Sequence, residues 1–275
     1  MPADEVGPNG EPPASAAGAA GFVASTLVIA IDGPAGSGKS TVARGVAQRL
    51  GLRYLDTGAA YRALTWWVLH ESVDPSDAAG VLDATDRFAL RLSTDPRQPG
   101  VTVGDTDVTA AVRAQDVTSA VSAVSAIPEV RRRLVELQRG LVGRGGIVVE
   151  GRDIGTTVCP DAQVKVFLTA SADARAARRS AEHSADDPKL LAGGAVAEVR
   201  ADLDRRDRLD SSRPTSPLMQ APDAVVLDST DIDAGAVIAR VLALVAERTG
   251  VTVLPSESED VQDVETFDSI GGERR

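Results

Sequence analysis

Short apolar runs recur along the chain, and each ends at a polar residue. The runs are LVIAI before Asp32, RYL before Asp56, IVV before Glu150, VKVFL before Thr169 and AVVL before Asp228. Because these runs do not alternate between apolar and polar residues, they predict strands buried on both faces of a parallel sheet. Helical patterns separate them, such as KSTVARGVAQRLG, which has an apolar stripe and ends at Gly51. The chain is therefore predicted to adopt an α/β layered fold with ligands at the carboxyl ends of the strands.

One segment, residues 62–146, interrupts this alternation. It combines helical patterns with the stretch FALRLSTDPRQPGVTVGDTDV, which predicts short strands with turns at Pro96–Gly100 and Gly104–Asp107. We expect this segment to be a subdomain inserted into a core formed by residues 26–61 and 147–253.

The net charge of −11 lies mainly in the two terminal segments. Residues 1–25 carry −3 and residues 254–275 carry −5, which leaves −3 for everything between them. The first segment is rich in alanine, proline and glycine and the last is polar and acidic, so we expect both to be disordered tails. Because the chain has no large basic excess, we expect no nucleic-acid polymer among its partners.

Other features narrow the class of protein. No apolar run reaches the roughly 18 to 20 residues of a membrane-spanning helix, and the N-terminal segment lacks the pattern of a signal peptide. We expect a cytoplasmic monomer with no membrane partner. The single cysteine, Cys159, is expected to be a buried apolar residue, and His70 and His183 are too few and too scattered for a metal site or a catalytic base.

The stretch IDGPAGSGKST contains a phosphate-binding loop. Its residues Gly33, Gly38, Lys39 and Ser40 match G-x-x-x-x-G-K-[ST] between a predicted strand and a predicted helix. The glycines let backbone N–H groups converge on phosphate oxygens, Lys39 adds a positive charge, and the Ser40 hydroxyl can reach Mg²⁺. The loop indicates a nucleoside triphosphate, which a switch, a motor or a kinase would bind.

Arginines are concentrated after the other strand ends. They are Arg62, Arg152, then Arg175, Arg178 and Arg179 on one helix face, and Arg205, Arg206, Arg208 and Arg213 in RRDRLDSSR. Taken alone, RRDRLDSSR would be interpreted as solvated salt bridges. Together with the loop, the arginines indicate a second phosphate-bearing ligand, because guanidinium groups pair bidentately with phosphate. We therefore favour a kinase with two phosphate sites.

The chain resembles the bacterial cytidylate kinases of the nucleoside monophosphate kinase superfamily. The stretches that carry the resemblance are IDGPAGSGKST, LDTGAAYRAL, AQDVTSAVSAVSAIPEVRRRL, VVEGRDIGTTVCPDAQVKVFL, RRDRLDSSR and APDAVVLDST. The resemblance implies a P-loop three-layer fold with a central parallel sheet, a monophosphate-binding subdomain at about 62–146 and a mobile lid at about 175–192. It also implies transfer of the γ-phosphoryl group of ATP to CMP or dCMP, with Mg²⁺, in pyrimidine nucleotide metabolism.

The resemblance further implies roles for individual residues. ATP would be bound by Gly33, Pro34, Ala35, Gly36, Ser37, Gly38, Lys39, Ser40 and Thr41, with Ser40 also on the magnesium ion. CMP would be bound by Arg62 and Arg152 at the phosphate, by Arg131 and Asp153 at cytosine, with Thr57 and Ser122 lining the pocket, by Arg206 and Asp210 at the sugar, and by Arg213 at the base or phosphate. The catalytic set would be Lys39, Arg152, Asp153, Arg178 and Arg179.

Two features depart from the family pattern, and three alternatives stay open. Thr57 stands where the family often has serine, and the long tails have no counterpart. The chain could phosphorylate another small acceptor such as UMP, AMP or an alcohol. It could be a nucleotide-dependent switch, although it lacks an N-K-x-D motif and its arginines would then be unexplained. A non-catalytic binding module is the third alternative, against which the intact Lys39, Ser40 and Asp153 count.

Overall fold

The computed structural model describes residues 25–186 and 195–251. Most of the two predicted tails and the last part of the predicted lid, residues 187–192, lie outside the described residues. Over the described ranges, the element order alternates strands and helices as the sequence predicts, apart from the segment around the small second sheet.

The core of the molecule is a five-stranded sheet in which every neighbouring pair is parallel. Its strands are β1 (Val28–Asp32), β2 (Arg53–Asp56), β6 (Ile147–Gly151), β7 (Val164–Thr169) and β8 (Val225–Asp228). The order across the sheet is β2-β6-β1-β7-β8. All five predicted strands are confirmed, and because they run in one direction their carboxyl ends share one edge of the sheet.

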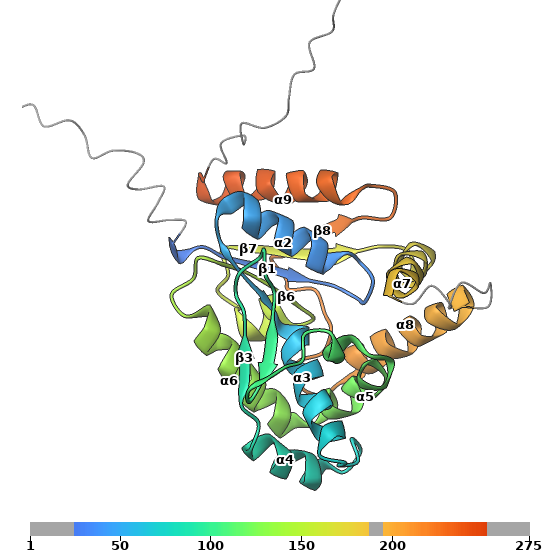
Figure 1. The fold of residues 1–275 in the computed structure, drawn as a ribbon. Coiled ribbons are helices and arrows are strands. Elements are labelled where there is room, and N and C mark those ends of the chain that lie inside the picture. Colours follow the sequence, from blue (N-terminus) through green and yellow to red (C-terminus); the bar gives the residue numbers. More distant parts are fainter. Residues whose placement is uncertain (1–24, 187–194, 252–275) are drawn as a thin grey trace, which may run out of the picture.

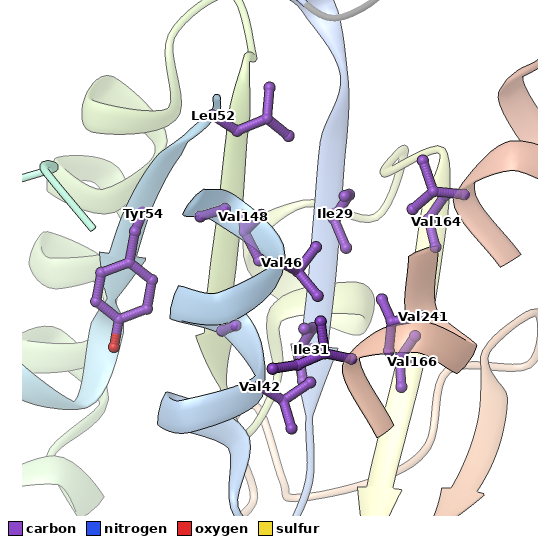
Figure 2. Packing of buried hydrophobic residues seen from close by; sticks show 14 of the residues in the cluster. Ile29, Ile31, Val42, Val46, Leu52, Tyr54, Val148, Val164, Val166 and Val241 are labelled. Atoms are coloured by element: carbon purple, nitrogen blue, oxygen red, sulfur yellow. The ribbon is translucent and has the colours of Figure 1, made fainter. Parts of the chain in front are cut away.

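Helices cover both faces of this sheet, which makes three layers (Figure 1). On one face lie α2 (Lys39–Leu50) and α9 (Ala234–Thr249), and Val42 and Val46 of α2 pack with Ile29 and Ile31 of β1 (Figure 2). On the other face, α6 (Pro128–Val142) packs against β1, β2 and β6. Helix α2 ends at the predicted residue, because Gly51 caps it in the left-handed conformation.

The last strand differs from the prediction of burial on both faces. Strand β8 pairs with β7 at the edge of the sheet, and its residues alternate between partial burial and exposure. Leu227 packs against the core cluster under α9, whereas Val226 on the opposite face is 48% exposed. An edge strand covered on one face can keep an apolar residue in solvent, and a short sequence run does not reveal which strand lies at the edge.

Helix α6 falls within the predicted insertion 62–146 but packs on the main sheet. Residues 57–126 form a separate group of elements below that sheet (Figure 1). They are α3 (Thr57–His70), α4 (Ala78–Asp86), a 3₁₀ turn (Ala111–Arg113), α5 (Gln115–Ala126) and an antiparallel sheet of β3 (Leu90–Leu92), β4 (Val101–Val103) and β5 (Thr106–Asp107). The short strands are confirmed. The second turn is tighter than predicted, because Gly104 adopts a φ of 58° and β5 already begins at Thr106. Helix α3 runs without a break across residue 62.

Two further helices, α7 (Ala172–Asp186) and α8 (Ala195–Ser212), pack against one another beside the ends of the strands (Figure 1). A π-helical turn at Ile154–Val158 follows β6. Its first two backbone N–H groups, from Ile154 and Gly155, each donate to the Asp32 carboxylate at 2.8 Å. Asp32 therefore anchors the end of β1 to the turn that follows the neighbouring strand.

Candidate active site

The loop between β1 and α2 has a backbone that only glycine can adopt at its critical points. Gly36 and Gly38 have φ angles of 74° and 89°. A Cβ atom on Gly33 would lie 2.0 Å from the Leu168 carbonyl oxygen, and one on Gly36 would lie 2.9 Å from the Arg175 carbonyl oxygen. Gly38 is also the N-cap of α2 and provides no side-chain cap for its first N–H groups. The loop thus offers backbone donors at a helix N-terminus, where an anion binds.

Lys39 begins α2 and points back into the loop. Its side chain is buried, and Nζ donates to the Pro34 carbonyl oxygen at 2.6 Å. Burial, and then the positive charge of Arg152, lower the pKa of Lys39 well below its ordinary value. An anion bound in the loop would favour the charged form of Lys39, so the site is electrostatically prepared for phosphate.

Ser40 contacts an acidic residue to which the sequence analysis assigned no role. Its Oγ donates to Glu150 Oε2 at 3.0 Å, and Glu150 lies at the end of β6 with 3% of its surface exposed. Burial, and then the charge of Asp56, raise the pKa of Glu150. The sequence carries a signal for a role of Glu150 in the site, because Glu150 is the polar residue that ends a buried strand beside the loop. The sequence pattern alone predicts only a strand end there.

A cavity of about 560 Å³ opens in front of the loop and reaches from α2 to α5, α6 and α8. The predicted site residues that line it are Ala35, Gly36, Gly38, Lys39, Ser40, Thr41, Thr57, Arg62, Ser122, Arg131, Arg152, Asp153, Arg179, Arg206, Asp210 and Arg213. Among the predicted residues, those outside the lining are Gly33, Pro34, Ser37 and Arg178. Residues far apart in the sequence therefore meet at a single cavity.

The lining is positively charged although the chain is acidic. Among the described residues, nine basic and five acidic side chains line the cavity. The basic ones are Lys39, Arg44, Arg62, Arg113, Arg131, Arg152, Arg179, Arg206 and Arg213, and the acidic ones are Asp56, Glu150, Asp153, Glu182 and Asp210. This excess of positive charge suits a ligand that carries several phosphates.

A buried ion pair lines the cavity. Arg131 of α6 donates through Nη2 to Asp153 Oδ2 at 2.6 Å, and its guanidinium carbon lies 5.1 Å from the centre of the Tyr61 ring. Ser122 of α5 lines the same cavity. The structure therefore brings together the two residues that the resemblance assigned to cytosine, in a cavity that Ser122 also lines, and it presents a donor and an acceptor side by side in a desolvated wall.

The residues at the start of α3 are already paired in this structure. Asp56 caps α3 by accepting from the Ala59 N–H at 3.0 Å and also accepts from Arg62 Nη2 at 2.7 Å. The Thr57 hydroxyl donates to the Glu150 carbonyl oxygen at 2.7 Å, so it holds the end of β6 while the residue lines the cavity. The Arg62 guanidinium is positioned by its carboxylate partner at the wall of the site.

Arginines that follow β6 and lie in or just after α8 meet at the cavity. Arg152 donates to Asp210 Oδ2 at 2.7 Å and to the Gly33 carbonyl oxygen at 2.9 Å, and Arg213 lies 3.3 Å from the other Asp210 oxygen. Arg206, one turn before Asp210 on α8, has a buried Nε without a hydrogen-bond partner. Burial, and then the charge of Arg152, lower the pKa of Arg206 to about 10. A buried guanidinium of this kind would be stabilised by an anionic ligand.

The three arginines of α7 serve different contacts despite sharing one helix face. Arg175 donates to the Ala35 carbonyl oxygen at 3.1 Å and pairs with Asp207 of α8. Arg178 donates to Ser229 Oγ at 2.9 Å, whereas Arg179 lines the cavity. In this structure Arg179 lines the cavity, whereas Arg178 lies beside the phosphate-binding loop, with its Nη1 4.0 Å from the position that a Cβ atom on Gly38 would take.

The remaining predictions concern residues outside the cavity. Cys159 is buried and forms no disulfide, as predicted. Within residues 25–186 and 195–251, no group of three or more histidine, cysteine, aspartate or glutamate side chains could hold a metal ion by itself. None of the helices in the same ranges is long and apolar enough to span a membrane.

Comparison with known proteins identifies close relatives. The family model described as cytidylate kinase matches residues 29–247. The chain is 52% identical to a cytidylate kinase of Streptomyces avermitilis over 81% of its own length and 94% of the relative's. It is 50% identical to that of Rhodococcus opacus over 82% of its length and 98% of the relative's, and 51% identical to that of Mycobacterium leprae over 82% and 97%.

Proposed function

The chain belongs to the cytidylate kinase family and phosphorylates CMP with ATP, and from this premise we propose how its residues hold the two substrates. The observation that carries the proposal is one cavity that is lined both by the phosphate-binding loop and by the buried Arg131–Asp153 pair. A nucleoside monophosphate placed with its base at that pair would direct its phosphate toward the loop. dCMP is proposed as a second acceptor.

The ATP site is assigned to the loop and the start of α2. Residues Gly33 to Thr41 would hold the phosphates through backbone N–H groups, and Lys39 would leave the Pro34 carbonyl to neutralise charge on the transferred group. This rearrangement is supported by the burial of Lys39, whose Nζ donates to a neutral carbonyl oxygen in this structure.

The oxygen donors beside the loop fit Mg²⁺. Ser40 Oγ and the Glu150 carboxylate are hard ligands, and magnesium usually binds through one or two such groups together with substrate phosphates and water. The absence of a larger acidic cluster among the described residues agrees with a metal that is held jointly with ATP. When bound, the metal would neutralise phosphate charge. Ser40 and Glu150 are the residues proposed to hold it.

The acceptor site is assigned to the opposite part of the cavity. Arg62 and Arg152 would bind the CMP phosphate, with Arg213 at the phosphate or the base, while Arg206 and Asp210 would bind the sugar. Arg131 and Asp153 would read the base, with Ser122 and Thr57 beside them.

Transfer needs no covalent nucleophile in this arrangement. The chain positions the attacking phosphate oxygen in line with the γ-phosphorus. Lys39, Arg152 and Arg179 neutralise the negative charge on the transferred phosphoryl group. Residues 62–146 are proposed to be the monophosphate-binding subdomain and residues 175–192 a lid. Closure of the lid would exclude water, which would otherwise take the phosphoryl group.

A coupled assay of ADP release tests the substrate assignment. The enzyme is given ATP and magnesium with CMP, dCMP, UMP or AMP in turn. We expect rapid ADP release with CMP and dCMP and little with the other two. Release with UMP as rapid as with CMP would overturn the base assignment, and release that needs no acceptor would indicate a nucleotide hydrolase.

A further inference from the structure

Tyr54 is buried in the sheet core, yet its hydroxyl reaches the site. The residue lies on β2 with 3% of its surface exposed, and its ring belongs to the cluster that packs beside α2 (Figure 2). The hydroxyl points along the strand toward the end where α2 begins (Figure 2) and donates to Glu150 Oε1. Tyr54 also lines the cavity. Its hydroxyl therefore makes a polar contact that packing of the ring does not require.

The two oxygens of Glu150 are held by different elements. Oε1 accepts from the Tyr54 hydroxyl of β2, and Oε2 accepts from Ser40 Oγ of α2 at 3.0 Å. The backbone carbonyl oxygen of Glu150 accepts from the Thr57 hydroxyl at 2.7 Å. These three hydroxyls set the rotation of the carboxylate as well as its position. Because Glu150 is only 3% exposed, water does not readily replace a lost donor.

The backbone of Tyr54 connects the same point to the inserted subdomain. Its N–H donates to the Thr94 carbonyl oxygen at 2.9 Å, and Thr94 lies in the loop between β3 and β4. That loop is also held to α2, since Arg44 and Gln48 donate to the Pro96 carbonyl oxygen at 3.2 and 3.1 Å. Tyr54 thus stands between the ATP end of the cavity and a loop of the proposed acceptor subdomain.

We propose that Tyr54 is a positioning residue for the ATP–magnesium site, acting through Glu150, which it holds in the orientation that also binds Ser40. The inference rests on the proposed magnesium site and adds a residue to it. Without the phenol, Oε1 has lost its hydroxyl donor in a buried place, and the carboxylate can rotate away from Ser40. The part of ATP affinity that depends on magnesium should then fall, while the part supplied by the loop N–H groups and Lys39 should not.

The test is calorimetric titration of Tyr54→Phe and wild type with ATP, with magnesium and with EDTA in its place. For Tyr54→Phe we expect the tightening of ATP binding by magnesium to fall about tenfold, as one lost hydrogen bond to a buried charged group implies. The Kd without magnesium should change less than about twofold. The control is Tyr61→Phe, because the other tyrosine of the chain contacts Arg131 and not Glu150. It should keep the wild-type magnesium effect.

Three results would overturn the inference. An unchanged magnesium effect in Tyr54→Phe would show that the phenol does not act on the site, and equal weakening with and without magnesium would show a purely structural role. If magnesium does not tighten ATP binding to the wild type, the proposed magnesium site itself fails, and the inference fails with it. Tyr54→Leu also lacks the hydroxyl and replaces Tyr54→Phe if that variant does not fold.

A double-mutant cycle separates action through Glu150 from any other route. In a Glu150→Gln background, Tyr54→Phe should leave the magnesium effect on ATP binding unchanged, because the group that it positions is already altered. A second tenfold loss in that background would show that Tyr54 acts independently of Glu150, contrary to the proposal.

Discussion

The Arg131 guanidinium and the Asp153 carboxylate form an ion pair of 2.6 Å with side-chain exposures of only 2% and 6%. Arg131 lies on α6, and Asp153 lies two residues after the end of β6 at Gly151. The two side chains meet at the cavity wall. Removing one partner of such a pair leaves an uncompensated buried charge, whereas a ligand can share both members. The pair is therefore a buried donor–acceptor surface, against which we propose that the base of the acceptor is read.

Base selectivity should follow from this surface. Cytosine offers an N4 donor to Asp153 and the N3 and O2 acceptors to Arg131, whereas uracil sets its O4 acceptor against the carboxylate and its N3 donor against the guanidinium. We expect kcat/KM for CMP to exceed that for UMP by about 10⁴ or more. dCMP should be a good substrate, because it keeps the 3′ hydroxyl.

Asp153→Asn should lower kcat/KM for CMP and narrow its advantage over UMP, since an amide can rotate to donate to O4. The measurement is kcat/KM for CMP, dCMP and UMP with both proteins. A wild-type enzyme that uses UMP as well as CMP, or a variant with unchanged discrimination, would contradict this assignment.

Lys39→Ala should lower kcat about a thousandfold or more with little change in Tm, because Lys39 is proposed to neutralise charge on the transferred group. Lys165→Ala is the matched control. Lys165 is also buried, but it pairs with Asp223 at 2.9 Å and lies outside the cavity lining. Lys165→Ala should lower Tm and leave kcat/KM within a few-fold of the wild-type value. Steady-state kinetics and thermal unfolding of the two variants reveal whether the expected contrast holds.

The two neighbouring arginines of α7 should differ in their effects. Arg179→Ala removes a cavity-lining charge and should lower kcat more than it weakens CMP binding, since closure of the proposed lid would bring this charge to the phosphates. Arg178→Ala removes the hydrogen bonds to Ser229, whose hydroxyl in turn donates to the Ser37 carbonyl oxygen at 3.1 Å. It should raise KM for ATP and lower Tm. Equal changes in kcat, substrate binding and Tm in the two variants would mean that α7 moves as one unit.

Asp32 should make stability depend on pH. Burial raises the pKa of Asp32 from 3.8 to about 6. The hydrogen bonds from the Gly155 and Ile154 N–H groups act in the opposite direction and lower this pKa, but their effect is smaller. Because the folded pKa lies above the unfolded value, the folded state holds more protons between about pH 4 and 6, and stability is lost as pH rises through that window. A rise in pKa of this size corresponds to about 3 kcal/mol.

Denaturant unfolding of wild type and Asp32→Asn between pH 4 and 7 measures this effect. The free energy of unfolding of the wild type, relative to the variant, should decrease by up to about 3 kcal/mol over that range. At every pH the variant should also lose one of its two backbone hydrogen bonds, because an amide NH₂ cannot accept from an N–H. If the difference in free energy of unfolding between the wild type and Asp32→Asn stays constant with pH, Asp32 titrates at its ordinary pKa.

Much of the fold could be predicted because its signals are local. Each buried strand is a short apolar run, and the phosphate-binding loop is specified by glycines whose φ angles are allowed to few other residues. The end of α2 at Gly51 is set by the same property. Sixteen of the twenty predicted site residues also line the cavity, and those that directly follow strands do so because residues that end parallel strands meet at one edge of the sheet.

What required the tertiary structure was the choice of partner for each side chain. The spacing of Arg178 and Arg179 places both on one face of a helix, but only the packing of α7 beside β8 and α8 sends one to Ser229 and the other to the cavity. Nothing near Tyr54 in the sequence indicates that its hydroxyl meets Glu150, which lies 96 residues away. Sequence patterns encode which faces are apolar and where the backbone can turn, because these depend on neighbouring residues. Pairing of charges depends on which elements pack together, and that is decided by the whole core.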